Sequence, residues 1–377
     1  MRKKLSLLLI LALIMSVVGM GCQSGQKPVT TGAKGVIQDE EFGNTYIDLT
    51  IVEFNNLGFT FGDSVDISFD NGKKITDIPY YSGYYCSVGE LLLCGYPGYP
   101  HVAFARNYGE STWKEYGLSE SSKMTVTLNT KAKYLKTEET FSLKYSKARE
   151  DFDSDAVFAN FREISGGKLR KESFYRAASP CDNTYNRARY ADELAKEYGV
   201  EFFINLSDTE EKYATLASAE GFGSNYYNWL YKQNKVLFLG LNANFTSDEF
   251  AKKVADAFYT MTKNKGPCLI HCVESKDRTG FVCAILLALA DASSEDIIKD
   301  YMITYANFYG ITQKSDPERY EAITRIIKNF LCYMCGAEYG TAVESLQLKA
   351  GAESYLKKGG LSDEQIAAIE EYLCKES

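Results

Sequence analysis

Histidine is scarce in this sequence, with only His101 and His271 among 377 residues. A Ser-His-Asp triad, or a zinc site built on several histidines, would therefore need one of these two positions. Long basic blocks are also missing: 42 Lys and Arg are outnumbered by 50 Asp and Glu, and the formal net charge is −8. Because nucleic-acid binding depends on clustered positive charge, we expect no nucleic-acid partner.

Long apolar runs are missing after the N-terminus. The first run, residues 5–18, follows Arg2, Lys3 and Lys4 and leads into small residues, which is the layout of a secretory signal. It is shorter than the about 20 apolar residues that a helix needs to cross a hydrocarbon core. We therefore expect an exported protein without a permanent transmembrane helix.

The residues Gly19-Met20-Gly21-Cys22 resemble the signal of bacterial lipoproteins, in which the cysteine is lipidated. The resemblance implies that residues 1–22 are a signal peptide with its lipidation cysteine, Cys22, and that a lipid anchors the extracytoplasmic protein to the cell membrane. That family prefers a branched aliphatic residue where Gly19 stands, so secretion without a lipid is the alternative. Residues 23–35 are polar and small, which predicts a flexible tether.

The hydrophobic pattern divides the rest of the chain in two. Residues 36–145 show short alternating runs interrupted by Gly and Asn, which predicts a small all-β domain, a barrel or a sandwich. Of these two we expect the barrel. In residues 150–377, apolar runs at 202–206, 236–241 and 267–272 are each followed by a helical pattern. This alternation predicts an α/β fold with a central, mostly parallel sheet flanked by helices.

The order of features in the first domain, FGN at 42–44, GDSVDI at 62–67 and HVAFARNYG at 101–109, is similar to one known barrel. It resembles the C-terminal β-barrel of S-adenosylmethionine hydroxide adenosyltransferases. That family forms its nucleoside site between this barrel and a preceding domain that has no counterpart in this sequence. The resemblance therefore implies a fold and no activity, and we interpret the domain as an accessory barrel.

The segment from Cys268 to Gly280 runs from an apolar strand through a polar turn into a helix. Cys272 ends the strand, and Arg278 follows after five residues and opens the helix. In such a turn, successive backbone N–H groups, the helix N-terminus and the guanidinium together bind a phosphate group. The same field favours a thiolate on Cys272, which is a nucleophile. The predicted phosphate-binding loop also contains Val273, Glu274, Ser275, Lys276 and Gly280.

This segment resembles the signature HCxxxxxR[ST]G of cysteine-dependent protein tyrosine phosphatases, and more narrowly the bacterial atypical branch HCxxGKDRTG. Ser275 departs from that branch, which has glycine; if the position needs a positive φ, serine strains the loop. Residues 160–167, 174–178, 300–305 and 355–373 resemble the same family, so the resemblance covers about residues 155–375. The seven matching signature positions are His271, Cys272, Lys276, Asp277, Arg278, Thr279 and Gly280.

The resemblance implies a protein tyrosine or dual-specificity phosphatase that acts through a phosphocysteine and needs neither a metal nor a cofactor. Cys272 would attack phosphorus, while Arg278 and the loop amides would hold the equatorial oxygens. Thr279 would donate a hydrogen bond to the sulfur. His271 would orient the loop and favour the thiolate. Arg176 would form a structural ion pair rather than act on the substrate.

Two questions stay open at this point. For the general acid, the resemblance points to Asp277, with two alternatives: Asp208, after a predicted strand, and Asp248, which we expect to cap a helix that starts at Glu249. For the substrate, a phosphorylated protein competes with inositol polyphosphates or phosphoinositides, because Lys276 adds a second cation to the loop. A third hypothesis is a non-catalytic protein that captures phosphorylated ligands, with Ser275 deforming the loop.

Overall fold

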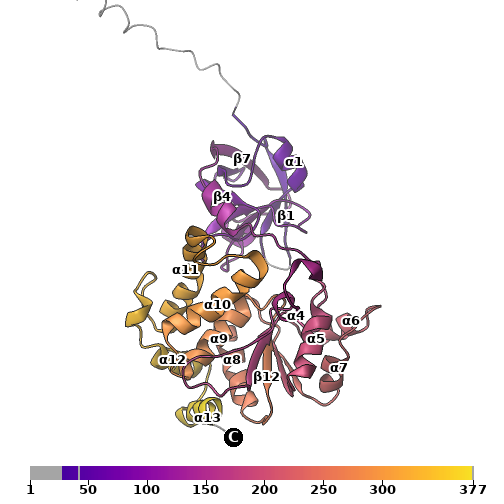
Figure 1. The fold of residues 1–377 in the computed structure, drawn as a ribbon. Coiled ribbons are helices and arrows are strands. Elements are labelled where there is room, and N and C mark those ends of the chain that lie inside the picture. Colours follow the sequence, from indigo (N-terminus) through magenta and orange to yellow (C-terminus); the bar gives the residue numbers. More distant parts are fainter. Residues whose placement is uncertain (1–27, 41–42, 376–377) are drawn as a thin grey trace, which may run out of the picture. The chain divides into compact units, whose positions relative to one another are not determined.

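The computed structural model describes residues 28–40 and 43–375, and the chain divides into two compact units, Met1–Glu138 and Glu139–Ser377 (Figure 1). The division falls before the expected boundary at residue 145. The reason is that Phe141 and Leu143 pack against the hydrophobic core of the second unit. The predicted signal peptide and Cys22 lie outside the described residues.

The first unit is a closed barrel of seven strands in the order β1-β2-β6-β5-β4-β3-β7, which confirms the predicted barrel. Neighbouring strands are antiparallel except β4 and β5, which are parallel. Its interior is aromatic: Phe54 stacks on Phe59, with ring centroids 4.2 Å apart, and both are fully buried. The elements are β1 (Lys34–Gln38), β2 (Thr45–Ile47), α1 (Ile51–Asn56), β3 (Ser64–Phe69), β4 (Lys74–Tyr81), β5 (Leu91–Cys94), β6 (Ala103–Arg106), α2 (Thr112–Glu115) and β7 (Lys123–Thr130). Helix α3 (Leu135–Phe141) begins in the first unit and ends in the second.

The end of the expected tether belongs to the barrel. The N–H of Thr31 donates to the carbonyl of Val126 at 2.9 Å, and the N–H of Val126 donates to the Thr31 hydroxyl, also at 2.9 Å. Lys34 and Gly35 then pair with β7 as the start of β1. The tether prediction is therefore wrong for residues 30–35, because their backbone groups find partners on the edge of β7; residues 23–27 lie outside the described residues.

The second unit contains a five-stranded sheet in the order β11-β10-β12-β9-β8. The first four of these strands are parallel to one another, and β8 is antiparallel to β9. Each apolar run singled out in the sequence contains one of the strands β10, β11 and β12. The strands are β8 (Arg162–Glu163), β9 (Phe174–Ala177), β10 (Phe202–Asn205), β11 (Val236–Phe238) and β12 (Cys268–His271).

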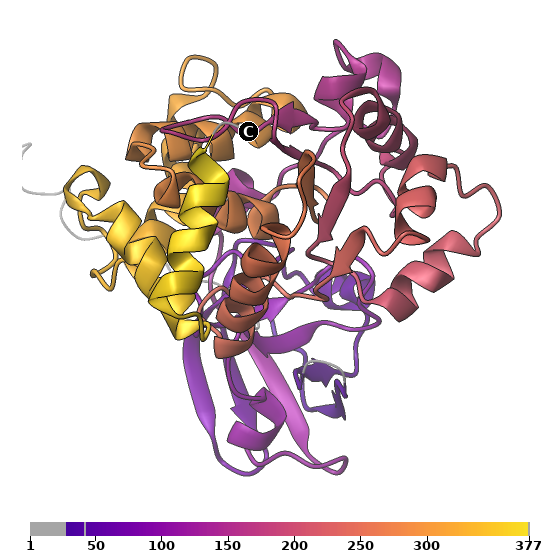
Figure 2. The same ribbon diagram turned by 90° about the horizontal axis from the view of Figure 1, so that it is seen from below.

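Helices cover both faces of this sheet (Figure 2). Successive residues of β10 belong to different hydrophobic clusters: Phe203 shares one with residues of α5 and α7, and Ile204 shares another with residues of α8 and α9. Among the described residues, none of the helices combines the length and apolar character needed to cross a membrane. The helices are η1 (Arg149–Asp151), α4 (Asp155–Phe158), α5 (Ala188–Glu197), α6 (Glu210–Ala217), α7 (Asn225–Tyr231), α8 (Asp248–Met261), α9 (Asp277–Leu289), α10 (Ser294–Tyr309), α11 (Pro317–Met334), η2 (Val343–Ser345), α12 (Leu348–Lys358) and α13 (Asp363–Cys374).

Helix α9 lies at the centre of the second unit. Every residue from Thr279 to Leu289 is buried, because the sequence from Phe281 onward is apolar on all sides of the helix. Strand β12, which leads into it, is also fully buried. The turn between them, residues 272–276, is thus held between two buried elements, and we call residues 272–278 the Cys272–Arg278 loop.

Candidate active site

The Cys272–Arg278 loop begins where β12 ends and finishes in the first turn of α9. The Cys272 side chain is 3% exposed, at the end of a buried strand. Lys276 occupies the N-cap of α9 without making a side-chain capping bond. No side chain at that position therefore competes for the first N–H groups of α9, and these groups and the helix dipole favour an anion.

Ser275 adopts a left-handed backbone conformation, with φ of 56°. Position 275 thus has the positive φ that glycine adopts without strain. A side chain in this conformation destabilises the fold by about 1–2 kcal/mol. The serine also gains a contact that glycine lacks: Arg176 Nε donates to its Oγ at 3.2 Å. Its carbonyl oxygen accepts hydrogen bonds from Arg176 Nη2 and from the Thr304 hydroxyl, the latter at 3.2 Å. These three bonds hold the unusual conformation in place.

The arginine that holds Ser275 belongs to a buried ion network beneath the loop. Arg176 Nη1 donates to Asp300 Oδ2, and Arg162 Nε donates to Asp300 Oδ1 at 3.3 Å. Burial alone would raise the pKa of Asp300, but the two arginines outweigh it and hold the pKa below its ordinary value. Arg176 thus binds the loop directly through Ser275, and both arginines form ion pairs with the Asp300 carboxylate.

Asn160 joins the same network. Its side-chain amide donates to the carbonyl of Glu274 at 3.3 Å and to the Thr304 hydroxyl at 3.0 Å, and its Oδ1 accepts from Arg162 at 2.6 Å. The sequence reasoning did not single out Asn160, Asp300 or Thr304 for this role. The signal was present, since all three lie in segments that carry the family resemblance.

The network predicts a difference between two substitutions at Ser275. Ser275→Gly removes both the strain and the bond from Arg176, so the free energy of unfolding should change by less than about 1 kcal/mol. Ser275→Ala keeps the strain and leaves the Arg176 Nε without that acceptor, so the protein should be less stable by about 1–2 kcal/mol. Urea unfolding of the three proteins tests this. If the alanine variant is as stable as the wild type, the Arg176 bond does not compensate for the strain.

Arg278 holds its position through the segment after β11. Its Nη1 donates to the carbonyl of Leu241 at 2.9 Å, and among the described residues no carboxylate forms an ion pair with it. The positive charge of Arg278 is therefore available to an anion in the loop. Residues 28–40 and 43–375 contain no group of three or more His, Cys, Asp or Glu side chains that could hold a metal ion.

The hydrogen bond expected from Thr279 to the Cys272 sulfur is not formed in this structure, and His271 does not orient the loop through a hydrogen bond of its ring nitrogens. The Thr279 hydroxyl is buried, and neither it nor the ring nitrogens of His271 have a hydrogen-bond partner among the described residues. The His271 ring instead lies against the rings of Phe203 and Tyr227. Burial lowers the pKa of His271, so the ring is neutral at pH 7 and adds no positive charge beside Cys272.

The three candidate acids have different surroundings. Asp277 starts α9, is 40% exposed, and accepts a hydrogen bond from the Tyr301 hydroxyl at 3.3 Å. Asp208 is fully buried and pairs with Lys212 Nζ at 2.8 Å. Burial would raise the pKa of Asp208, but the bonds from Lys212 and Asn205 outweigh it and lower the pKa. A carboxylate stabilised in this way is a poor proton donor.

Asp248 does not act as the helix cap that we expected. Helix α8 starts at Asp248, and the N-cap is Ser247, whose hydroxyl accepts from the N–H of Phe250 at 3.1 Å. Ser247 wins because the cap needs extended backbone one residue before the helix. Asp248 is 91% exposed and pairs with Lys358 at 3.1 Å. Of the three acids, Asp277 is the one that belongs to the loop.

Lys276 lies between two carboxylates of the loop. Its Nζ is 3.7 Å from Glu274 Oε2 and 3.7 Å from Asp277 Oδ2. Burial would lower the pKa of Lys276, but Asp277 and Glu274 outweigh it and hold the pKa well above its ordinary value. The positive charge of Lys276 is therefore largely compensated inside the loop.

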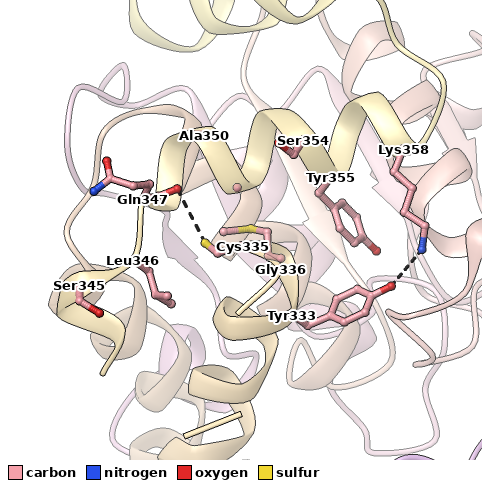
Figure 3. A pocket seen from close by; sticks show the side chains of 12 residues that line it. Tyr333, Cys335, Gly336, Ser345, Leu346, Gln347, Ala350, Ser354, Tyr355 and Lys358 are labelled. Carbon is pink, nitrogen blue, oxygen red and sulfur yellow. Dashed lines mark hydrogen bonds between the residues drawn. The ribbon is translucent and has the colours of Figure 1, made fainter. Parts of the chain in front are cut away.

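A cavity of about 630 Å³ lies elsewhere, among α11, η2 and α12 (Figure 3). No residue of the Cys272–Arg278 loop lines it. Two of its tyrosines bond to the segment that follows Leu241: Tyr355 donates to the carbonyl of Phe245 at 2.7 Å, and Tyr333 donates to that of Thr246 at 3.0 Å. The cavity wall thus helps to fix the segment to which Arg278 is bonded.

The matches to known proteins include a family model and a named relative. The model of a family described as the tyrosine phosphatase family matches residues 156–375, which is more than half of the chain. A protein of Nostoc commune named tyrosine-protein phosphatase is 29% identical over 111 residues. That match covers 28% of this chain and 38% of the relative, so the chain spans well under half of the relative's length.

Proposed function

The chain belongs to the tyrosine phosphatase family, and on this premise we propose that it is a cysteine-dependent phosphomonoester hydrolase of the protein tyrosine or dual-specificity class. One observation carries the proposal. Cys272 and Arg278 stand at the two ends of a single loop, between a buried strand and the uncapped start of a buried helix. This arrangement combines a nucleophile with a binding site for the phosphoryl oxygens.

In the proposed reaction, the Cys272 sulfur attacks phosphorus and the bond to the leaving oxygen breaks. Asp277 donates a proton to that oxygen, because it is the exposed acid of the loop and Asp208 is held as a carboxylate. Water then attacks phosphorus in the phosphocysteine, with Asp277 accepting a proton from it. The bond between sulfur and phosphorus breaks, which restores the Cys272 thiolate and releases inorganic phosphate. Arg278 and the loop amides stabilise the charge on the equatorial oxygens in both steps.

Charge in the loop supports phosphotyrosine as the substrate. Glu274 lies 3.7 Å from Lys276 whether or not Asp277 carries the proton that it donates, so the loop offers no free second cation to an additional phosphate. Tyrosines of α10 lie beside the loop. The Tyr301 hydroxyl donates a hydrogen bond to Asp277, and the hydroxyls of Tyr301 and Tyr305 are hydrogen-bonded to each other. Inositol polyphosphates, which carry several negative charges, fit these surroundings less well.

Export and anchoring form a separate part of the proposal. We infer from the N-terminal pattern that the protein acts outside the cytoplasm, attached to the membrane by a lipid on Cys22, with the barrel as an accessory domain. Growth with a labelled fatty acid tests this, because the label should enter the wild-type chain and be lost in Cys22→Ser. A labelled Cys22→Ser chain would exclude lipidation at this cysteine.

The experiment that tests the activity is phosphate release by residues 23–377, measured with reductant and a chelator present. The substrates are a phosphotyrosine peptide, a phosphoserine peptide, phosphatidylinositol phosphates and inositol hexakisphosphate. We expect the phosphotyrosine peptide to have the highest kcat/KM. A preference for inositol hexakisphosphate would favour the inositol alternative, and binding of phosphopeptides without release of phosphate would favour the non-catalytic alternative.

A further inference from the structure

Tyr145 lies outside the range that matches the family, in the segment between α3 and α4, yet it contacts the Cys272–Arg278 loop. Its hydroxyl donates a hydrogen bond to Glu274 Oε1, across 129 residues of sequence. Glu274 is the second residue after the nucleophile Cys272. A segment that precedes the family's domain thus reaches the candidate active site.

The ring of Tyr145 is held on several sides. It stacks on Phe308 with centroids 5.1 Å apart, and it forms a T-shaped pair with Tyr309 with centroids 5.2 Å apart. The guanidinium of Arg187 lies 4.6 Å from the ring centroid. Arg187 is buried and also donates to the carbonyl of Ser146 at 3.1 Å, so it holds the backbone next to Tyr145. The hydroxyl is therefore fixed in position, and not free to leave Glu274.

The carboxylate of Glu274 has a partner at each oxygen. Oε1 accepts from Tyr145, and Oε2 lies 3.7 Å from Lys276 Nζ. Burial, and then the negative charge of Glu274, raise the pKa of Tyr145, so the hydroxyl remains a donor at neutral pH. The backbone of Glu274 is fixed separately, through the bond from Asn160 to its carbonyl.

We propose that Tyr145 is a positioning residue of the active site, which holds the Glu274 carboxylate against Lys276 and away from the bound phosphoryl group. The proposal rests on the proposed function. Without the hydroxyl of Tyr145, Oε1 loses its partner and the carboxylate becomes mobile beside an anion-binding loop. A mobile negative charge there repels a dianionic substrate, and this weakens binding more than it slows the chemical steps.

A double-mutant cycle tests the proposal, with the wild type, Tyr145→Phe, Glu274→Gln and the double variant. The readouts are kcat and KM for a phosphotyrosine peptide, the Kd of orthovanadate, and Tm. Tyr145→Phe keeps the ring and its stacking, so Tm should change little. We expect KM and the orthovanadate Kd to rise about five- to tenfold, with kcat within about twofold. In the Glu274→Gln background, the same substitution should have no further effect.

The matched control is Tyr190→Phe, a tyrosine of α5 whose ring packs on Phe158 and which lies outside the loop and its network. It should leave KM and the orthovanadate Kd unchanged. An effect of Tyr145→Phe that is equally large in the wild-type and Glu274→Gln backgrounds, or no effect at all, would overturn the proposal. Orthovanadate binding does not depend on turnover. If the wild type releases no phosphate, the proposed activity is refuted, and the orthovanadate Kd values still test the role of Tyr145.

Discussion

Cys272→Ser is expected to lower kcat for a phosphotyrosine peptide by about 10⁴-fold or more, because a serine hydroxyl is not ionised at neutral pH and cannot replace a thiolate nucleophile. Serine is close to cysteine in size. Cys272 is 3% exposed, and its sulfur forms no hydrogen bond with the described residues that serine would lose. The Tm of the variant should therefore stay within a few degrees of the wild type. Phosphate release and thermal unfolding of the two proteins measure this.

The same variant separates chemistry from binding. It keeps Arg278, the loop amides and the helix N-terminus, so it should still bind the phosphotyrosine peptide while releasing no phosphate. Isothermal calorimetry of peptide binding provides the control. A variant that neither binds the peptide nor releases phosphate has a disrupted loop, and its inactivity would say nothing about the nucleophile. Activity above about 1% of the wild type in a pure preparation would mean that Cys272 is not the nucleophile.

Asp277→Asn is expected to lower kcat for the phosphotyrosine peptide by about 10²- to 10³-fold, which is the range for the loss of a general acid. Asparagine keeps the shape of the side chain, and its oxygen can still accept from Tyr301. The loss should be much smaller for para-nitrophenyl phosphate, whose leaving group needs little protonation. The fall of kcat at high pH should also vanish, because the group that must be protonated is gone.

Asp208→Asn is the matched control for this prediction. It removes the partner of Lys212, whose Nζ lies 2.8 Å from Asp208 Oδ1, so it should lower the stability of the fold. It should not produce a loss that depends on the leaving group. If Asp208→Asn shows that dependence and Asp277→Asn does not, Asp208 is the general acid and the assignment to Asp277 is wrong.

Several features of the fold follow from local sequence patterns. The short alternating runs predicted a barrel or a sandwich, and the barrel that we expected is confirmed, although its first strand starts inside the expected tether. Family membership follows from the signature around Cys272 and from segments further along, and the match over residues 156–375 confirms it. The assignment of the barrel to a known fold, the lipid anchor and the roles of the loop residues stay predictions.

The sequence by itself determined the loop between Cys272 and Arg278, because a strand, a five-residue turn and a helix are set by neighbouring residues and a short spacing. The tertiary structure alone decided which positive charges near the loop are paired with carboxylates and which remain available to a phosphoryl group. Arg176 and Asp300 are 124 residues apart, and Tyr145 and Glu274 are 129 apart, yet each pair forms a direct bond. The reason is physical: the pairing of β9 with β12 and the packing of α10 bring these groups together, and spacing along the chain does not encode such contacts.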